Sequence, residues 1–239
     1  MELTLSEALA AQHRRIDPTR WDEVYVVGDL HGCPAALDSL VDDVGITDDD
    51  LLVFVGDLVR KGPDSAGVIE RVRGAPNALS VRGNNEEKLL RGDATLPELD
   101  AADLQWLRSL PVAISWAGGS GYGQGLVVHG GVDPRRPLEE HAVGDLQTMR
   151  CLGSDSGYQG PFWYDSYEGP PRVFFGHTVH SHPLVDDWAV GLDTGYVYGG
   201  ALTAYRLGDG TVHQVEPDRT EVERADAKVV STEPGGTDD

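Results

Sequence analysis

VYVVGDLHG, at residues 24–32, is an apolar run that ends on an aspartate and a histidine. Its first four residues favour a β-strand, and Asp29 and His31 follow two positions apart, with Gly28 and Gly32 beside them. Just past the end of a strand, alternate residues can turn toward the same cleft, and glycines permit a tight turn and close approach of a ligand. A carboxylate and an imidazole at this spacing form the start of a divalent-metal site.

The same pattern recurs along the chain. Four further apolar runs end on Asp, Asn or His beside a glycine: residues 51–55 before Gly56-Asp57, residues 78–81 before RGNNE at 82–86, residues 126–128 before His129, and residues 173–175 before Gly176-His177. Any one of these residues alone is as well explained by an ordinary turn or a hydrogen-bonded histidine. In open α/β sheets, however, the ligand crevice lies at the carboxyl ends of the strands. We therefore expect the five segments to converge on one site.

Length and composition favour a single domain. The 239 residues are enough for one α/β core, which we assign to residues 1–216, and the polar, acidic residues 217–239 are expected to form a flexible tail. Residues 1–20 lack the apolar segment of a signal peptide, and no run approaches the length of a membrane span. Two cysteines, Cys33 and Cys151, do not make a disulfide framework or a zinc site, so we expect a cytoplasmic protein.

The net charge is strongly negative. The chain has 19 Lys and Arg against 40 Asp and Glu, a formal charge of −21. This balance disfavours a nucleic-acid duplex or an anionic membrane as partner. Acidic residues spread along the chain also suggest a halophilic surface, a hypothesis that a melting series in molar KCl tests, because stability falling steadily with salt would contradict it.

Periodicity and breaker residues predict the remaining elements. Helices are expected at residues 3–15, 34–44, 65–73 (capped by Asp64 or Ser65), 85–91 and 99–110. Strands are expected at residues 112–116 and 126–129, joined by a hairpin connection at 118–125, and at 173–175 and 188–193, with a closing hairpin at 197–207. Residues 133–160 read as irregular.

The residue types at the strand ends indicate the chemistry. Oxygen ligands with imidazoles suit Mn²⁺, Fe²⁺ or Zn²⁺. Asp57 lies between two groups of ligands, where it could bridge two ions. A two-metal site can acidify a bridging water and neutralise a phosphoryl group. Two carboxylates cannot balance two divalent ions, so the pocket would stay locally positive and attract phosphate.

Five motifs carry a resemblance to a known family. GDLHG, GDLVRKGPDS, RGNNE, VHGG and FGHT, in this order, resemble the phosphoprotein-phosphatase branch of the calcineurin-like metallophosphoesterases, over residues 24–207. The resemblance implies an α/β fold of two mixed β-sheets packed as a sandwich and flanked by helices. GLDTGYVYGGALTAYRL at 191–207 and PFWYDSY at 161–167 are similar to the prokaryotic branch of serine/threonine phosphatases and symmetrical diadenosine tetraphosphatases.

The resemblance also implies the ligands of two metal ions, most readily Mn²⁺, with Fe or Zn as alternatives. The first ion would be held by Asp29, His31 and Asp57. The second would be held by Asp57, Asn84, His129 and His177.

Two motifs depart from the family pattern. The second motif has Arg60 and Lys61 where the family has Asp and Arg, and the third motif has Asn85 where the family has a histidine. In the family this histidine is the general acid for the leaving group, and the aspartate orients it. Asparagine cannot donate a proton near neutral pH, so the change favours substrates with good leaving groups, such as nucleoside diphosphates. His180 or His182 could supply the proton instead.

Other residues are candidates for binding substrate. Lys61 would attract phosphate as a point charge, and Arg60 or Arg150 would clamp it, whereas Arg82 is as readily structural. Trp163 and Tyr164, with Tyr167, could stack on a base or line a peptide groove, or could pack in the core. Asp57, Asn84, Asn85, Arg60 and Lys61 form the expected catalytic set.

The predicted function is that of a dinuclear phosphohydrolase in which a bridging hydroxide attacks a phosphoester or phosphoanhydride. Its partner would be a phosphorylated protein or a dinucleoside polyphosphate. The alternatives are a pseudophosphatase that binds phosphorylated partners without turning them over, which the missing acid motivates, and a nucleic-acid end phosphatase, which the acidic charge disfavours.

Overall fold

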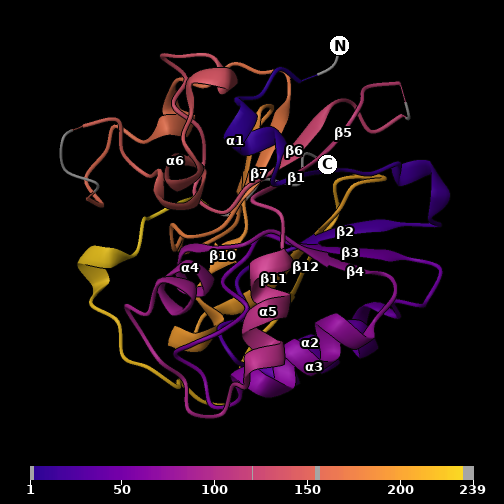
Figure 1. Ribbon diagram of the computed structural model, residues 1–239, viewed down its shortest axis with the longest axis vertical. Helices are drawn as coiled ribbons and strands as arrows, with labels where there is room; N and C mark the ends of the chain where they lie inside the picture. The colour runs from indigo at the N-terminus through magenta and orange to yellow at the C-terminus, as the bar shows by residue number, and fades with distance from the viewer. Residues whose placement is uncertain (1–2, 120, 154–156, 234–239) are drawn as a thin grey trace.

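Two mixed β-sheets pack face to face in the computed structural model, which describes residues 3–119, 121–153 and 157–233 (Figure 1). One sheet has the order β1-β5-β6-β7-β9-β8, and the other has the order β10-β11-β2-β3-β4 with β12 paired to β11. The expected sandwich is therefore confirmed, with helices on the outer faces.

The second sheet is built on three parallel strands, β2 (Val24–Val27), β3 (Leu51–Phe54) and β4 (Ala78–Ser80). β2 and β3 are buried at every residue, as expected for parallel strands covered on both faces. The helices that cover this sheet are α2 (Pro34–Val44), α3 (Ser65–Gly74) and α5 (Ala101–Ser109), with the short α4 (Asn84–Arg91) after β4. Val27 pairs with Phe54, so β2 and β3 end side by side and deliver their polar residues to one edge.

The first sheet repeats this arrangement. β6 (Gly125–Val127), β7 (Arg172–Phe175) and β9 (Ala189–Gly191) are parallel. β5 (Ala113–Trp116) pairs antiparallel with β6, which confirms the hairpin expected there, although residue 120 in its connection lies outside the described residues. The core between the sheets is apolar and includes Val26, Val53 and Phe174.

Several predicted elements are wrong. Residues 3–15 do not form one helix: α1 (Glu7–Ala10) is a single turn, and β1 (His13–Arg15) pairs with the edge of β5. The region 133–160, expected to be irregular, contains the helix α6 (Val143–Thr148). The run 188–193 is divided between β9 and β10 (Asp193–Thr194), which belong to different sheets.

The closing hairpin also differs from expectation. Tyr196–Tyr198 is a short 3-10 turn, and β11 (Ala201–Arg206) pairs antiparallel with β10, with β2 and with β12 (Val212–Val215). β8 (Leu184–Val185) closes the edge of the other sheet. Gly195 precedes this 3-10 turn and Gly199 follows it, and both have positive φ.

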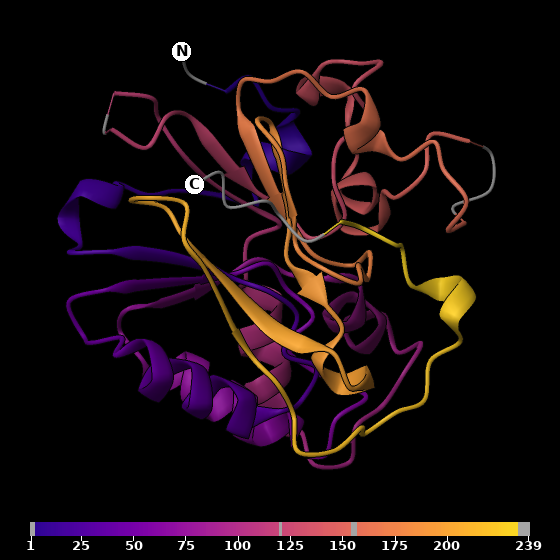
Figure 2. The ribbon, with the colours of Figure 1, turned by 180° about the vertical axis from the view of Figure 1, so that it is seen from behind.

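The segment after residue 217 makes specific contacts where the structure describes it. It crosses from one sheet layer to the other along the side of the molecule, coloured yellow in Figure 2. The amide of Val222 donates to Val197, and the amide of Val230 donates to Val179. Residues 234–239, also assigned to the tail, lie outside the described residues. Among the described residues, no helix combines the length and apolarity that a membrane span requires.

Candidate active site

Asp29, His31 and Asp57 meet at the carboxyl ends of β2 and β3. His31 Nε2 lies 3.7 Å from Asp29 Oδ2 and 3.8 Å from Asp57 Oδ2. One ligand atom from each of the three residues lies within 4.8 Å of the others, and all three side chains are buried. The parallel register of β2 and β3 therefore places two carboxylates and an imidazole in one small space.

A second group adjoins Asp57 on its other side. His129 Nε2 lies 3.2 Å from Asp57 Oδ1 and 3.0 Å from Asn84 Oδ1. The same amide oxygen of Asn84 lies 2.9 Å from His177 Nδ1. The structure thus brings all six predicted ligands together from both sheets, with Asp57 between the two groups.

The backbone at these residues is held in an unusual conformation. His31, Asp57 and His177 have positive φ values of 46°, 51° and 64°. Such values are sparsely populated by residues with a side chain, and they persist where the surroundings impose them. The turns after the strands therefore aim these side chains into the site at a conformational cost.

Glu86 holds the turn around Asp57, a role that was not predicted. Its carboxylate is fully buried and accepts from the amides of Asp57 at 3.0 Å, Val59 at 3.2 Å and Gly83 at 2.7 Å. Burial and Asp57 raise the pKa of Glu86 to about 7. The sequence holds a partial signal, because a glutamate at the third position of a helix commonly accepts from the amide of the N-cap residue, here Gly83.

Two motif glycines are required by close packing against the carboxylates. A Cβ on Gly176 would lie 2.0 Å from Asp29 Oδ1, and a Cβ on Gly83 would lie 2.4 Å from Asp57 Oδ1. Real side chains do not approach this closely, so any larger residue would displace the carboxylates. These two glycines therefore let the backbone approach the Asp29 and Asp57 carboxylates closely.

The electrostatics of the cluster suit a divalent cation. Asp29 Oδ1 is buried and has no hydrogen-bond partner among the described residues. Burial, Asp193 and Asp57 raise the pKa of Asp29, while burial and Lys61 lower the pKa of His31 to about 3. A buried oxygen without a donor, beside a neutral imidazole, is a costly arrangement that a bound cation would relieve.

Asp57 and His177 also have strongly shifted pKa values. Burial alone would raise the pKa of Asp57, but His129 and His31 hold it well below its ordinary value. Burial, together with His129, holds the pKa of His177 well below its ordinary value. Burial would lower the pKa of His129, but Asp57 raises it. An ionised Asp57 with neutral His31 and His177 is the protonation state in which these groups bind metal.

Arg60 and Asn85 are joined to Asp57 in one chain of hydrogen bonds. The Arg60 guanidinium donates to the side-chain oxygen of Asn85, and the Asn85 amide nitrogen donates to Asp57 Oδ2. The backbone amide of Asn85 also donates to Asp57 Oδ1 at 2.8 Å. The two departures from the family pattern are therefore in direct contact and form one unit.

Lys61 and Arg150 border the cluster. Lys61 Nζ lies 2.7 Å from His31 Nε2, and Arg150 Nη2 lies 2.8 Å from His177 Nε2. Burial lowers the pKa of Arg150. Both cations are placed where they would face an anion bound at the site.

Three predicted substrate-binding residues have structural roles instead. Arg82 is buried, pairs with Glu87 at 3.0 Å and donates to the carbonyl of Arg108, so it links α4 to α5. Trp163 is fully buried against Phe175 and donates to Gly130 at 3.1 Å. Tyr164 stacks on Phe175 and contacts His180, so neither ring offers a free face to a base.

His180 is also part of this core, contrary to the suggestion that it could be a proton donor. It is fully buried, and its Nε2 lies 3.0 Å from the hydroxyl of Tyr164. His182 is exposed and contacts the carbonyl of Thr232.

The burial of His180 predicts a pH dependence of stability. Burial lowers its pKa to about 4 from 6.5, so the unfolded chain binds the proton more tightly than the folded one. The stabilisation is complete above pH 6.5 and is lost as the pH falls through 4, by roughly 3 kcal/mol. His180→Phe is expected to reduce the change in the free energy of unfolding between pH 7 and pH 4 by this amount. His182→Phe is the control, and equal curves for wild type and His180→Phe would contradict the prediction.

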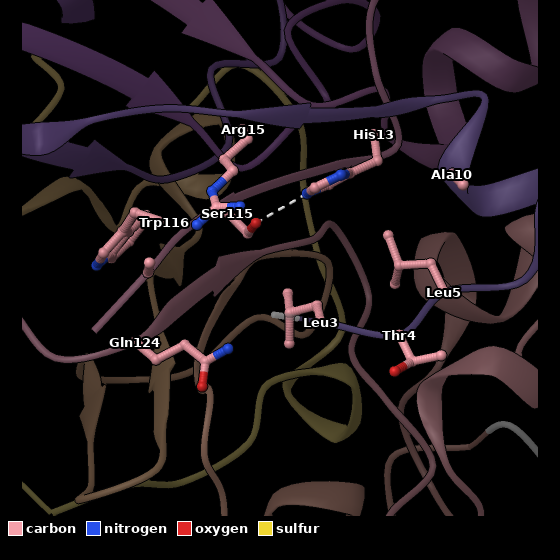
Figure 3. A pocket seen from close by; sticks show the side chains of 10 residues that line it. Leu3, Thr4, Leu5, Ala10, His13, Arg15, Ser115, Trp116 and Gln124 are labelled. Atoms are coloured by element: carbon pink, nitrogen blue, oxygen red, sulfur yellow. Dashed lines mark hydrogen bonds between the residues drawn. The ribbon is translucent and has the colours of Figure 1, made fainter. Parts of the chain in front are cut away.

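A separate cavity of about 420 Å³ lies beside β1 and β5 (Figure 3). It is lined by Leu3, Leu5 and Trp116 among others, and its polar contact is His13 Nε2 to Ser115 Oγ at 2.8 Å. None of the predicted site residues lines it. It is therefore distinct from the cluster at the strand ends.

Comparisons with known proteins agree with this geometry. A symmetrical bis(5′-nucleosyl)-tetraphosphatase from Chromohalobacter salexigens is 28% identical over 81% of this chain and 97% of its own length. The asymmetrical bis(5′-nucleosyl)-tetraphosphatase PrpE from Halalkalibacterium halodurans is 28% identical over 76% of this chain and 89% of its own.

Solved structures give the same result. A crystal structure provisionally described as a diadenosine tetraphosphatase superimposes with a TM-score of 0.75 at 30% identity, covering 86% of this chain and 97% of that one. A protein serine/threonine phosphatase from Saccharomyces cerevisiae, at 17% identity and a TM-score of 0.56, shares the fold. The family described as calcineurin-like phosphoesterase matches residues 23–204. This chain, with its buried Asp-His-Asp cluster at the strand ends, belongs to the calcineurin-like phosphoesterase family.

Proposed function

We propose that this phosphoesterase hydrolyses dinucleoside polyphosphates and depends on two bound divalent ions, most readily Mn²⁺. The observation that carries the proposal is the meeting of six buried or nearly buried ligand side chains around Asp57. Asp29, His31 and Asp57 would hold one ion, and the second would be held by Asp57, Asn84, His129 and His177. When bound, the ions would supply an acidified water as nucleophile and neutralise charge on the phosphoryl group.

The protein's own residues would orient the substrate. Lys61 and Arg150, which contact His31 and His177, border the cluster and would bind oxygens of the phosphoryl group. The Asp57 carboxylate is fixed by the amides of Asn85, and its backbone is fixed by Glu86. These contacts would keep the ligands in place during turnover.

The leaving group favours a polyphosphate over a simple ester. Asn85 cannot deliver a proton, and Arg60 occupies its side-chain oxygen. A nucleoside diphosphate leaves as a stable anion and needs no proton, whereas the alkoxide of phosphoserine does. The relatives named as symmetrical and asymmetrical tetraphosphatases support the same substrate class.

The setting of the protein is proposed from its composition. Cys33 and Cys151 are free and buried, which supports a reducing, cytoplasmic location. The charge of −21 supports a surface adapted to high salt.

A substrate panel tests the proposed function. Purified protein loaded with Mn²⁺ is assayed on diadenosine tetraphosphate, p-nitrophenyl phosphate, and phosphoserine and phosphotyrosine peptides, in low and high salt. We expect the highest kcat/KM for the dinucleotide, loss of turnover in EDTA and recovery on adding Mn²⁺. A peptide preferred over the dinucleotide would indicate a phosphoprotein phosphatase. Absence of metal-dependent turnover in every buffer would indicate a pseudophosphatase.

A further inference from the structure

The C-terminal segment spans the side of the molecule that holds the candidate site. At one end, the amides of Glu221 and Val222 donate to the carbonyl of Val197, which follows β10. At the other end, Val230 exchanges backbone hydrogen bonds of 2.8 Å with Val179 and Ser181, which follow β7. Figure 2 shows the segment linking the two layers, and it lies beyond the part of the chain that matches the family.

Arg224 lies between these two anchors and points back to the body of the protein. Its Nη2 donates to the hydroxyl of Tyr158 at 2.7 Å, and its Nε donates to the carbonyl of Lys228 at 3.0 Å. The guanidinium carbon lies 4.5 Å from the ring centre of Tyr198 and 5.5 Å from that of Tyr158. Two aromatic rings and a carbonyl therefore fix its orientation.

Tyr198 lies beside a predicted metal ligand, and Tyr158 lies beside a residue that borders the cluster. The ring of Tyr198 lies 6.3 Å from the ring of His31, and Lys61 Nζ lies 5.2 Å from its centre. Arg150, which contacts His177, lies 4.2 Å from the centre of Tyr158. Tyr198 thus lies between Arg224 and His31, and Tyr158 lies between Arg224 and Arg150.

Among the described residues, three cations near the candidate site lack a direct ion pair, whereas at least half of the arginines have one. Several arginines of the described chain form ion pairs with carboxylates: Arg71, Arg73, Arg82, Arg91, Arg135, Arg136, Arg206 and Arg219. Arg60, Lys61 and Arg224 have no carboxylate of the described residues within 4.0 Å, although acidic residues outnumber basic ones twofold. Burial raises the pKa of the Asp193 carboxyl, and Lys61 and Arg224 act to lower it without contacting the carboxyl directly. Their NH groups therefore remain placed for an external anion.

Resting on the proposed function, we propose that Arg224 is a specificity residue that binds the phosphate chain beyond the phosphoryl group under attack. A guanidinium positioned by two aromatic rings keeps the NH groups that Tyr158 and Lys228 do not use for phosphate oxygens. Lys61 and Arg150 lie against the metal ligands, whereas Arg224 lies one ring further out, where a second phosphate would extend. A phosphomonoester such as p-nitrophenyl phosphate has no group at this position.

Binding of ADP and AMP tests this role without requiring turnover. Isothermal titration is carried out on Mn²⁺-loaded wild type, Arg224→Gln and Arg224→Lys. We expect wild type to bind ADP more tightly than AMP, and Arg224→Gln to weaken ADP binding on the order of tenfold more than AMP binding. Arg224→Lys is expected to weaken ADP binding less than Arg224→Gln does, because lysine keeps the charge but lacks the several NH groups of a guanidinium.

Arg219→Gln is the matched control, since it removes the same charge from an exposed arginine of the same segment that pairs with Glu221. It is expected to bind both nucleotides as wild type does. In kinetics, Arg224→Gln should raise KM for diadenosine tetraphosphate at least tenfold more than KM for p-nitrophenyl phosphate.

The outcomes separate this inference from the proposed function. If wild type fails to hydrolyse the dinucleotide, the proposed function fails, and the ADP and AMP titrations still decide the role of Arg224. Equal binding of ADP and AMP by wild type would overturn the inference. So would an equal weakening of both in Arg224→Gln, which would show a structural role, or tighter binding, which would show that the segment blocks the site.

Discussion

Asp57→Asn is expected to lower kcat/KM for p-nitrophenyl phosphate on the order of 10³-fold, the largest loss of any single substitution here. Asp57 lies between the two ligand groups, 3.8 Å from His31 Nε2 and 3.2 Å from His129 Nε2. The amide keeps the shape of the side chain but removes the charge that would be shared by both ions. Loss of a supporting group costs about 10–100-fold, so loss of a shared ligand should cost more.

The assay uses Mn²⁺-saturated protein and a matched control. Asp38→Asn makes the same chemical change at an exposed residue that pairs with Arg71, and it should leave kcat/KM unchanged. Circular dichroism and thermal melting establish that both variants fold. Activity of Asp57→Asn within tenfold of wild type would show that Asp57 is not a shared ligand.

The second large effect is a gain of activity. The double variant Arg60→Asp/Asn85→His is expected to raise kcat for a phosphoserine peptide about 10²-fold, because it introduces an imidazole that can protonate the alkoxide and a carboxylate that can orient it. Arg60 and Asn85 are in direct contact, so the two new side chains would also lie together. Arg60 has a φ of 72°, a conformation that aspartate adopts more readily than arginine.

The control for this gain is a substrate whose leaving group needs no proton. Turnover of p-nitrophenyl phosphate should change less than tenfold, because nitrophenolate leaves without a proton. Asn85→His alone should gain less, since the Arg60 guanidinium would face the new imidazole and disfavour its protonated form. Equal gains on both substrates, or none on the peptide, would show that general acid catalysis is not what this chain lacks.

The position of the site could be predicted from the sequence because it depends on strand ends. Parallel strands in register must deliver their following residues to one edge, and the glycines beside Asp29, Asp57 and His177 mark where the chain turns. The departures at Arg60 and Asn85 were also visible in the sequence, whereas their direct contact is seen only in the structure.

The roles of isolated side chains could not be predicted in the same way. Trp163 and Tyr164 are residue types that can stack on a base, but both rings pack against the buried ring of Phe175. Arg82 forms an ion pair with Glu87, and this pair depends on the position of α4 after β4. Composition indicates only that such residues can bind aromatic or anionic groups, not which groups lie next to them.

The C-terminal segment gave no sequence signal. Its residues are polar and acidic, a composition typical of a loose tail, whereas its attachment depends on backbone hydrogen bonds from Val222 and Val230. Nearly every residue carries the same backbone N–H and C=O groups, so composition does not indicate which of them will pair. The proximity of Arg224 to the site was therefore visible only in the structure.

Metal content measured on the intact protein tests the central claim most directly. Protein stripped with EDTA, reloaded with Mn²⁺ and freed of excess metal is analysed for bound ions, and a crystal of it is examined by anomalous scattering at the manganese edge. We predict two ions per chain, one among Asp29, His31 and Asp57, and one among Asp57, Asn84, His129 and His177. A protein that binds no Mn²⁺, or binds it away from Asp57, would contradict the account.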